Sequence, residues 1–142
     1  MATDNELLSD IYRASRVGAE TLDNLISKTK NSDIQEELKR EKKVYRDFQD
    51  KTFKEIRSRN EYPKPVKKAQ IKMSKMGIEM NTIFDKSQSH IADIVIQGNN
   101  MGIIGMTKSI NSNKHADKNV NSLANELVGI QKENIEHLLK YL

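Results

Sequence analysis

The spacing of apolar residues is the feature that most limits what this chain of 142 residues can become. In several long stretches the apolar residues recur every three or four positions, which places them along one face of a helix. No stretch of useful length alternates apolar and polar residues with the period of two that marks a strand. The sequence therefore predicts an all-α protein, and its length predicts one domain over residues 1–142.

The first two helices are predicted over residues 4–29 and from Ser32 to a point before Pro63. Thr3 with Glu6, and Ser32 with Gln35, have the spacing of capping boxes and are expected to fix the two starts. The run EYPKP ends the second helix because proline lacks an amide donor and restricts the residue before it. The expected inner lines are Leu8, Ile11, Ser15, Gly18, Leu22 and Leu25 in the first helix, and Ile34, Leu38, Glu41, Tyr45, Phe48, Thr52 and Ile56 in the second.

The third helical pattern runs over residues 66–111, which would make one helix of about 69 Å at ~1.5 Å per residue. Such a helix would leave much of its apolar face uncovered, so we expect a break near residues 85–89, with Ser87 or Ser89 capping a new start. This predicts a short extra helix in the crossover between the second and third main helices. An unbroken helix is the alternative, and it would imply dimerisation through the projecting part.

The last helix is predicted over residues 115–141. Its expected inner line is Ala116, Val120, Leu123, Leu127, Gln131, Asn134, Leu138 and Tyr141. Two amides on this otherwise apolar line, together with Glu41 on the second helix, make Glu41, Gln131 and Asn134 candidates for a polar core.

Three glycines occupy the most apolar part of the chain, in the segment GNNMGIIGM. We assign Gly98, Gly102 and Gly105 to the core face together with Ile91 and Ile94. Glycine destabilises a helix interior, so its use there indicates close packing against a neighbouring backbone or ring. The rings of Tyr12, Tyr45 and Phe48 are candidates. A phosphate-binding loop is disfavoured because the spacing is not GxGxxG and no P-loop lysine follows.

Composition restricts the chemistry. Aromatic residues make up 5% of the chain, and cysteine and tryptophan are absent. Aliphatic and methionine side chains must form the core, and neither a disulfide nor a thiolate metal site can form. We expect no secretory signal and no membrane span, and hence a cytoplasmic protein.

Four helices of matched length, a proline-bearing crossover and a third helix beginning SHIADIVIQG together resemble the ferritin-like superfamily, in particular its rubrerythrin-type and small bacterial members. The resemblance implies a four-helix bundle. Metal-binding members use a carboxylate from each of two helices and Glu-x-x-His from the other two. In this chain the residue three positions after Glu41 is Val44, where the motif has histidine. On the last helix, Gln131 and Asn134 have the spacing of the Glu and the His of the second motif. We therefore expect no di-metal centre and no cofactor.

Glu41 has two interpretations. It can pair with the amides of Gln131 or Asn134, or reach solvent beside Lys42, and then be purely structural. Alternatively, it is the remnant of a metal-ligand set. The first interpretation is favoured because an unpaired buried carboxylate is costly.

Basic charge is concentrated in one segment. Residues 39–75 contain 14 Lys and Arg against five Asp and Glu, whereas the whole chain has a net charge of +4. A positive surface of this kind can attract nucleic acid, although a solvated helix face is the simpler interpretation. The candidate basic patch comprises Lys39, Arg40, Lys42, Lys43, Arg46, Lys67 and Lys68.

Three functions stay open at this point. The favoured one is a non-catalytic ferritin-like bundle with a structural or interaction role. It would form a homodimer through the glycine surface or through a methionine stripe formed by Met73, Met76 and Met80. The second is an iron-binding oxidoreductase or storage protein with an atypical site around Glu41, Gln131 and Asn134. The third is an electrostatic binder of nucleic acid through residues 39–75.

Overall fold

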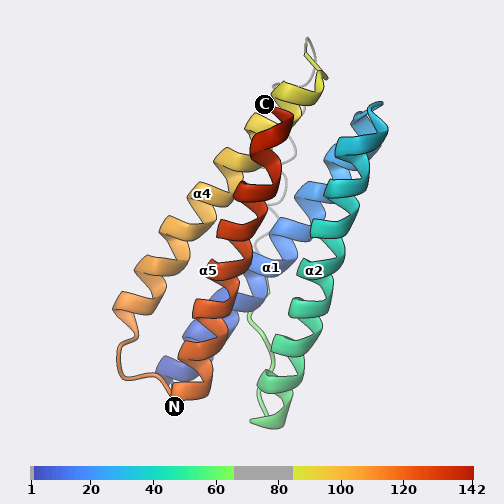
Figure 1. Cartoon of the computed structure of the whole chain (residues 1–142). Coiled ribbons are helices and arrows are strands. Elements are labelled where there is room, and N and C mark those ends of the chain that lie inside the picture. Colours follow the sequence, from blue (N-terminus) through green and yellow to red (C-terminus); the bar gives the residue numbers. More distant parts are fainter. Residues whose placement is uncertain (1, 66–84) are drawn as a thin grey trace.

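The computed structural model describes residues 2–65 and 85–142, with the backbone alone for residues 2 and 3. These residues form four long helices, α1 (Ala2–Lys28), α2 (Ser32–Ser58), α4 (Gln88–Ser112) and α5 (Lys118–Leu138), followed by the short 3₁₀ helix η1 (Leu139–Tyr141). The helices pack together as a bundle (Figure 1). The prediction of an all-α protein is confirmed, with no strand in the described ranges. The extra helix predicted in the crossover falls within residues 66–84, outside the described residues.

The helix starts differ from the predicted capping boxes. Helix α1 already begins at Ala2, a strong helix former, so Thr3 lies inside the helix rather than at its cap. Helix α2 is capped by Asn31, whose side-chain oxygen accepts hydrogen bonds from the amides of Asp33 and Ile34. Gln35 instead donates to the carbonyl of Ile26, at the end of α1. Both predicted boxes are therefore wrong.

The predicted break before the third main helix is confirmed. Helix α4 begins at Gln88, and the hydroxyl of Ser87 accepts a hydrogen bond from the amide of His90 at 3.3 Å. A serine side chain that satisfies a free amide in the first turn is a standard helix start. The end of α2 at Ser58, before Pro63, also agrees with the sequence.

The core lies between the four helices and consists mainly of leucine, isoleucine and valine. The predicted inner line of α2 is buried at every position, and that of α5 is buried from Val120 to Leu138. In α1 the predicted line is buried except at Gly18, which is half-buried. Three of the four faces were thus predicted from periodicity alone.

Helix α4 is the exception, because it turns a different face to the core from the predicted one. Its buried residues are Ile91, Ala92, Val95, Asn99 and Met106. Gly98 and Gly105, which were assigned to the core face, are exposed, and Met101 between them is 74% exposed. Apolar residues surround this helix on most sides, so their spacing does not single out one face.

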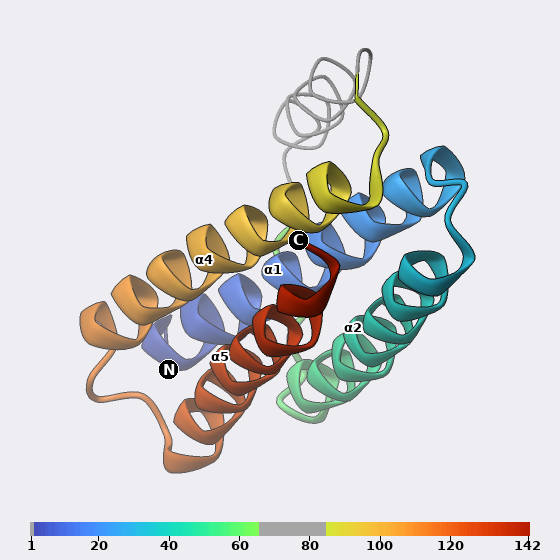
Figure 2. The same cartoon turned by 45° about the horizontal axis from the view of Figure 1, so that its top comes forward.

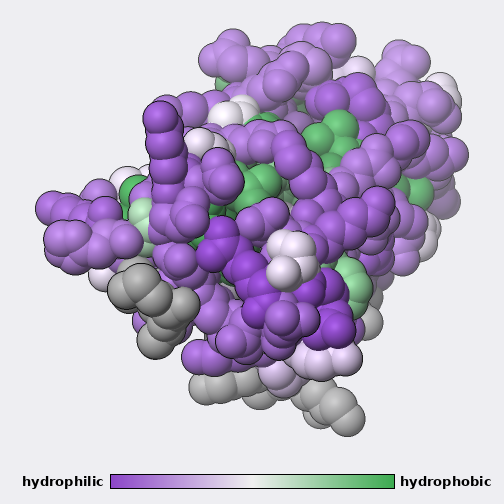
Figure 3. Space-filling model, turned by 90° about the horizontal axis from the view of Figure 1, so that it is seen from below, coloured by the Kyte–Doolittle hydropathy of each residue, from purple (hydrophilic) through white to green (hydrophobic). Residues whose placement is uncertain are grey.

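The contacts at the two ends of the bundle show in which direction each helix runs. Arg59, just after α2, forms ion pairs with Asp4 of α1 at 3.2 Å and with Asp117, the cap of α5, at 3.5 Å. The amide of Asp117 donates to the Asp4 carboxylate at 2.7 Å. The start of α1, the end of α2 and the start of α5 therefore meet at one end. Figure 3 views the molecule from this end, where hydrophilic side chains cover most of the surface.

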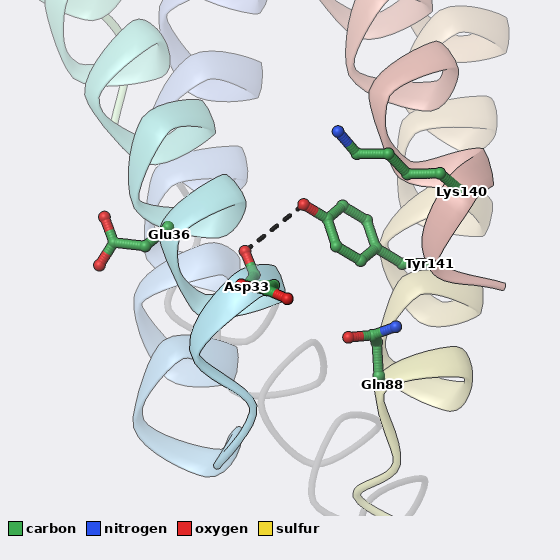
Figure 4. A pocket seen from close by; sticks show the side chains of 5 residues that line it. All are labelled: Asp33, Glu36, Gln88, Lys140 and Tyr141. Atoms are coloured by element: carbon green, nitrogen blue, oxygen red, sulfur yellow. Dashed lines mark hydrogen bonds between the residues drawn. The ribbon is translucent and has the colours of Figure 1, made fainter.

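At the opposite end, a shallow cleft is lined by the first turns of α2 and α4 and by η1. Its lining residues are Asp33, Glu36, Gln88, Lys140 and Tyr141. The Tyr141 hydroxyl donates to the carbonyl of Asp33 at 3.5 Å (Figure 4). Helices α2 and α4 thus start at the same end and run parallel to each other, while α1 and α5 run the other way.

The helices associate as two hairpins, α1 with α2 and α4 with α5, which have the most extensive contacts. Between the hairpins, α1 packs on α4 and α5, and α2 packs on α5. Figure 2 shows this arrangement with the top of the view in Figure 1 turned towards the reader. Residues 59–87 connect the end of α2 to the start of α4 at the opposite end of the bundle. Among the described helices, none is both long enough and apolar enough to span a bilayer.

Candidate functional site: a buried polar cluster

Five polar side chains are buried together between the two hairpins, and we refer to them as the polar cluster. Glu41 and Tyr45 lie on α2, Asn99 on α4, and Gln131 and Asn134 on α5. Each is at most 5% exposed. Spacings of three or four residues on α2 and α5 place neighbouring members on the same helix face. The sequence therefore predicted three of the five: Glu41, Gln131 and Asn134.

Tyr45 is the centre of the cluster. Its hydroxyl donates a hydrogen bond to the side-chain oxygen of Asn99 at 2.9 Å, and the Asn99 amide donates to the carbonyl of Val95, also at 2.9 Å. Burial raises the pKa of Tyr45, and Glu41, once ionised at high pH, raises it further, while hydrogen bonds with the side chains of Asn134 and Gln131 lower it. Because burial is the largest of these effects, the phenol of Tyr45 stays protonated.

Glu41 is neutral in the folded protein at pH 7. Its carboxyl group is fully buried, and neither oxygen accepts a hydrogen bond from a described residue. Burial, together with a hydrogen bond to Glu37 and the charge of Glu37, raises the pKa of Glu41 to about 9. A protonated Glu41 can donate a hydrogen bond to the Glu37 carboxylate. The oxygens of Glu41 therefore do not need a donor from another residue.

Glu37 carries the negative charge of this carboxyl pair. Burial alone would raise its pKa, but hydrogen bonds from Arg40 and Glu41 outweigh this effect and lower the pKa of Glu37. The Arg40 guanidinium contacts both carboxylate oxygens, the closest at 2.8 Å. The imidazole Nδ1 of His137 lies 3.3 Å from Glu37 as well. The charge thus stays at the rim, where Arg40 balances it, and the interior is uncharged.

This donor set does not fit a di-metal centre. Two such ions need several anionic oxygen ligands as well as imidazoles, whereas the interior offers amides, a phenol and one protonated carboxyl group. Val44, at the position where the resemblance would place a histidine, has no ligating atom. In the described part of the chain, no three His, Asp or Glu side chains are grouped so that they could hold a metal ion.

The three glycines of α4 do not share one role. A Cβ atom on Gly102 would overlap the Gln131 amide nitrogen, so the close packing expected of this residue is present, against an amide rather than a ring. Gly98 and Gly105 are exposed, and a Cβ atom on either would have no neighbour within 4 Å, so their assignment to the core is wrong. Each lowers helix stability by about 0.5–1 kcal/mol relative to alanine. It is Gly18 of α1 that contacts an aromatic ring, that of Tyr45.

The basic patch is largely neutralised by neighbouring acidic side chains. Arg40 pairs with Glu37, Lys42 with Asp23 and Lys43 with Asp47, each at 2.7 or 2.8 Å. Lys39 lies 3.7 Å from Glu36, and Arg46 donates to Gln49. Lys67 and Lys68 lie outside the described residues. Paired lysines and arginines release fewer counterions on binding a phosphate backbone, so this geometry weakens the case for nucleic acid.

Sequence reasoning missed Asn99, the hydroxyl of Tyr45 and Glu37. Asn99 was overlooked because the face of α4 was predicted wrongly. A signal was available, since Tyr45 lies on the predicted inner line one turn after Glu41 and a buried phenol requires a partner. The chain itself matches no protein family model, no curated protein and no solved structure.

Proposed function

We propose that this protein is a ferritin-like helical bundle without a di-metal centre, which acts as a structural or interaction protein through its outer surface. Two hairpins joined by one long crossover are the arrangement of ferritin-like bundles. The parallel directions of α2 and α4, set by the contacts at the two ends, support this assignment.

The observation that carries the proposal is the donor set of the interior, which offers one carboxyl group and otherwise amides and a phenol. In a ferritin-like bundle the inward positions midway along the helices hold the metal ligands. Here Glu41, Gln131 and Asn134 occupy inward positions, and Glu41 is protonated beside Glu37. The positions that would neutralise metal ions thus hold two amides and a single carboxyl group. Because all five members of the polar cluster are buried, a substrate could not reach them without opening the bundle.

Partner binding is therefore assigned to the surface, and we propose that the partner includes a second copy of the chain. A basic surface for nucleic acid is less well supported, because Lys39, Arg40, Lys42 and Lys43 on α2 have acidic neighbours.

Metal titration tests this proposal. The full chain is incubated with excess Fe²⁺ or Mn²⁺, desalted and assayed by elemental analysis, in parallel with Glu41→Ala. We expect no stoichiometric metal in either protein, because neutral amides bind these ions weakly. Two metal ions per wild-type chain, lost in Glu41→Ala, would overturn the proposal and support the iron-binding alternative.

A further inference from the structure

The outer side of α4 is exposed and carries apolar side chains, with no residue of the described ranges packed over it, and we call it the α4 outer face. It comprises Gln97, Gly98, Met101, Ile104, Gly105 and Lys108, and the half-buried Ile94, which packs against the core, lies at its edge. Met101 is 74% exposed and Ile104 is 56% exposed, the former the most exposed large apolar side chain in the described ranges. No charged residue occurs in positions 94–107. Contiguous apolar surface of this kind is typical of an interaction site.

Nothing within the described part of the chain explains Gly98 and Gly105 on this face. Neither has a positive φ, so the backbone conformation does not require glycine. Neither approaches another residue, since a Cβ atom would have no neighbour within 4 Å. Two helix-weakening residues flanking an exposed methionine are instead suited to close approach by another helix.

The face is complementary to itself about a two-fold axis through Met101. In an antiparallel pair of α4 helices, residues equally far before and after Met101 lie at the same level. Gly98 then faces Ile104 of the partner subunit, and Gly105 faces Gln97 of the partner subunit. Each glycine thus receives a larger side chain, which is the self-complementarity that a two-fold interface requires.

Charge favours the same orientation. Asp93 and Lys108 are the nearest charged residues on either side of the apolar stretch, and both are exposed. In an antiparallel pair, Asp93 lies within one residue of the level of Lys108 of the partner subunit. In a parallel pair, each would face its own copy and be repelled.

We propose that two copies of this chain associate through the α4 outer face, with their α4 helices antiparallel and crossing at Met101. This inference rests on the proposed role as an interaction protein, and it specifies the partner and the surface. A single helix pair is a small interface, so we expect an affinity of roughly micromolar order.

Sedimentation equilibrium of the full chain, from about 1 to about 200 μM, measures this association. We expect a concentration-dependent rise from the monomer mass of 16.3 kDa towards twice that value. Met101→Glu places two like charges at the axis and is expected to weaken dimerisation at least tenfold. Gly129→Glu is the matched control, because Gly129 is an exposed glycine of α5 with no neighbour within 4 Å of its Cβ position. It is expected to leave the association unchanged.

The orientation is tested by single cysteines, which the natural chain lacks. Under mild oxidation, Met101→Cys is expected to form a disulfide-linked dimer, since the two sulfurs lie at the axis. Ile94→Cys is not expected to do so, because in an antiparallel pair its own copies lie far apart. Efficient crosslinking of Ile94→Cys would overturn the antiparallel arrangement.

Charge reversal gives a second test that does not depend on oxidation. Asp93→Lys and Lys108→Asp are each expected to weaken the dimer severalfold, and the double variant to recover it. If the wild-type chain is monomeric at every concentration, the inference is wrong. The α4 outer face would then bind another part of the chain or a different protein. That result would leave the metal titration unaffected, so the two proposals fail separately.

Discussion

Glu41→Gln is expected to raise the free energy of unfolding at pH 7 by roughly 3 kcal/mol. The folded protein holds Glu41 protonated, with a pKa of about 9, whereas the unfolded chain ionises it near 4.5. Keeping the proton on at pH 7 costs about 1.4 kcal/mol for each pH unit above 4.5. Glutamine has the same shape and no proton to lose. Urea unfolding measures the difference, and the midpoint of thermal unfolding should rise by roughly 10 °C.

The pH dependence has a definite sign. Since the pKa of Glu41 is higher in the folded state, the wild-type protein binds a proton that the unfolded chain releases between about pH 4.5 and 9. Its stability therefore falls as the pH rises through this window. Glu37 has a lowered pKa in the folded state, so its ionised form stabilises the folded protein. This contribution to stability is lost at acid pH, below the window in which Glu41 acts. The Glu41→Gln variant is expected to show a much flatter profile between pH 5 and 9.

Glu36→Gln is the matched control, since Glu36 lies on the same helix, is exposed and contacts Lys39 at 3.7 Å. Its effect is expected to stay within about 0.5 kcal/mol, as for most surface substitutions. A loss of stability in Glu41→Gln at pH 7 would contradict the assignment, because it would mean that the folded protein uses an ionised Glu41.

Gly18→Ala is expected to lower the free energy of unfolding by about 1–3 kcal/mol, as overpacking of a core does. A Cβ atom at this position would lie 3.0 Å from two carbon atoms of the Tyr45 ring. The ring is 4% exposed and its hydroxyl is bonded to Asn99, so a shift of the ring would strain its packing and that bond. The steric cost therefore exceeds the gain in helix propensity. Chemical denaturation measures the sum of the two effects.

Gly129→Ala is the control with the opposite expected sign. No atom lies within 4 Å of the new Cβ, so only helix propensity changes, and stability should rise by about 0.5–1 kcal/mol. If Gly18→Ala stabilised the protein to the same extent, the Tyr45 ring would have room to shift, and the packing described around the polar cluster would be incorrect.

The sequence predicted the inner faces of α1, α2 and α5 because each alternates apolar residues with charged ones, which confines the apolar residues to one side. In α2, the buried line from Ile34 to Ile56 was predicted at every position. Helix α4 lacks this contrast, because positions 94–107 carry no charge. Its orientation depends on Asn99 pairing with Tyr45 of another helix, 54 residues away, which no local pattern encodes.

For the polar cluster, the sequence identified Glu41, Gln131 and Asn134 from their positions on apolar lines. It could not indicate which partner each would find. The protonation of Glu41 depends on the distance to Glu37 and on the depth of burial, and both arise from packing between helices. The capping predictions failed for a related reason, since Asn31 competed successfully with Ser32 for the free amides of α2.

The division into two hairpins has a consequence for the order of folding. Linkers of three and five residues join the helices within each hairpin, so these pairs close at low entropic cost. Docking one hairpin on the other closes a connection of 29 residues and comes later. The polar cluster draws Glu41 and Tyr45 from the first hairpin and its amides from the second. A hairpin docked out of register would leave the buried Tyr45 hydroxyl without Asn99, so this one bond favours the correct alignment at the final step of assembly.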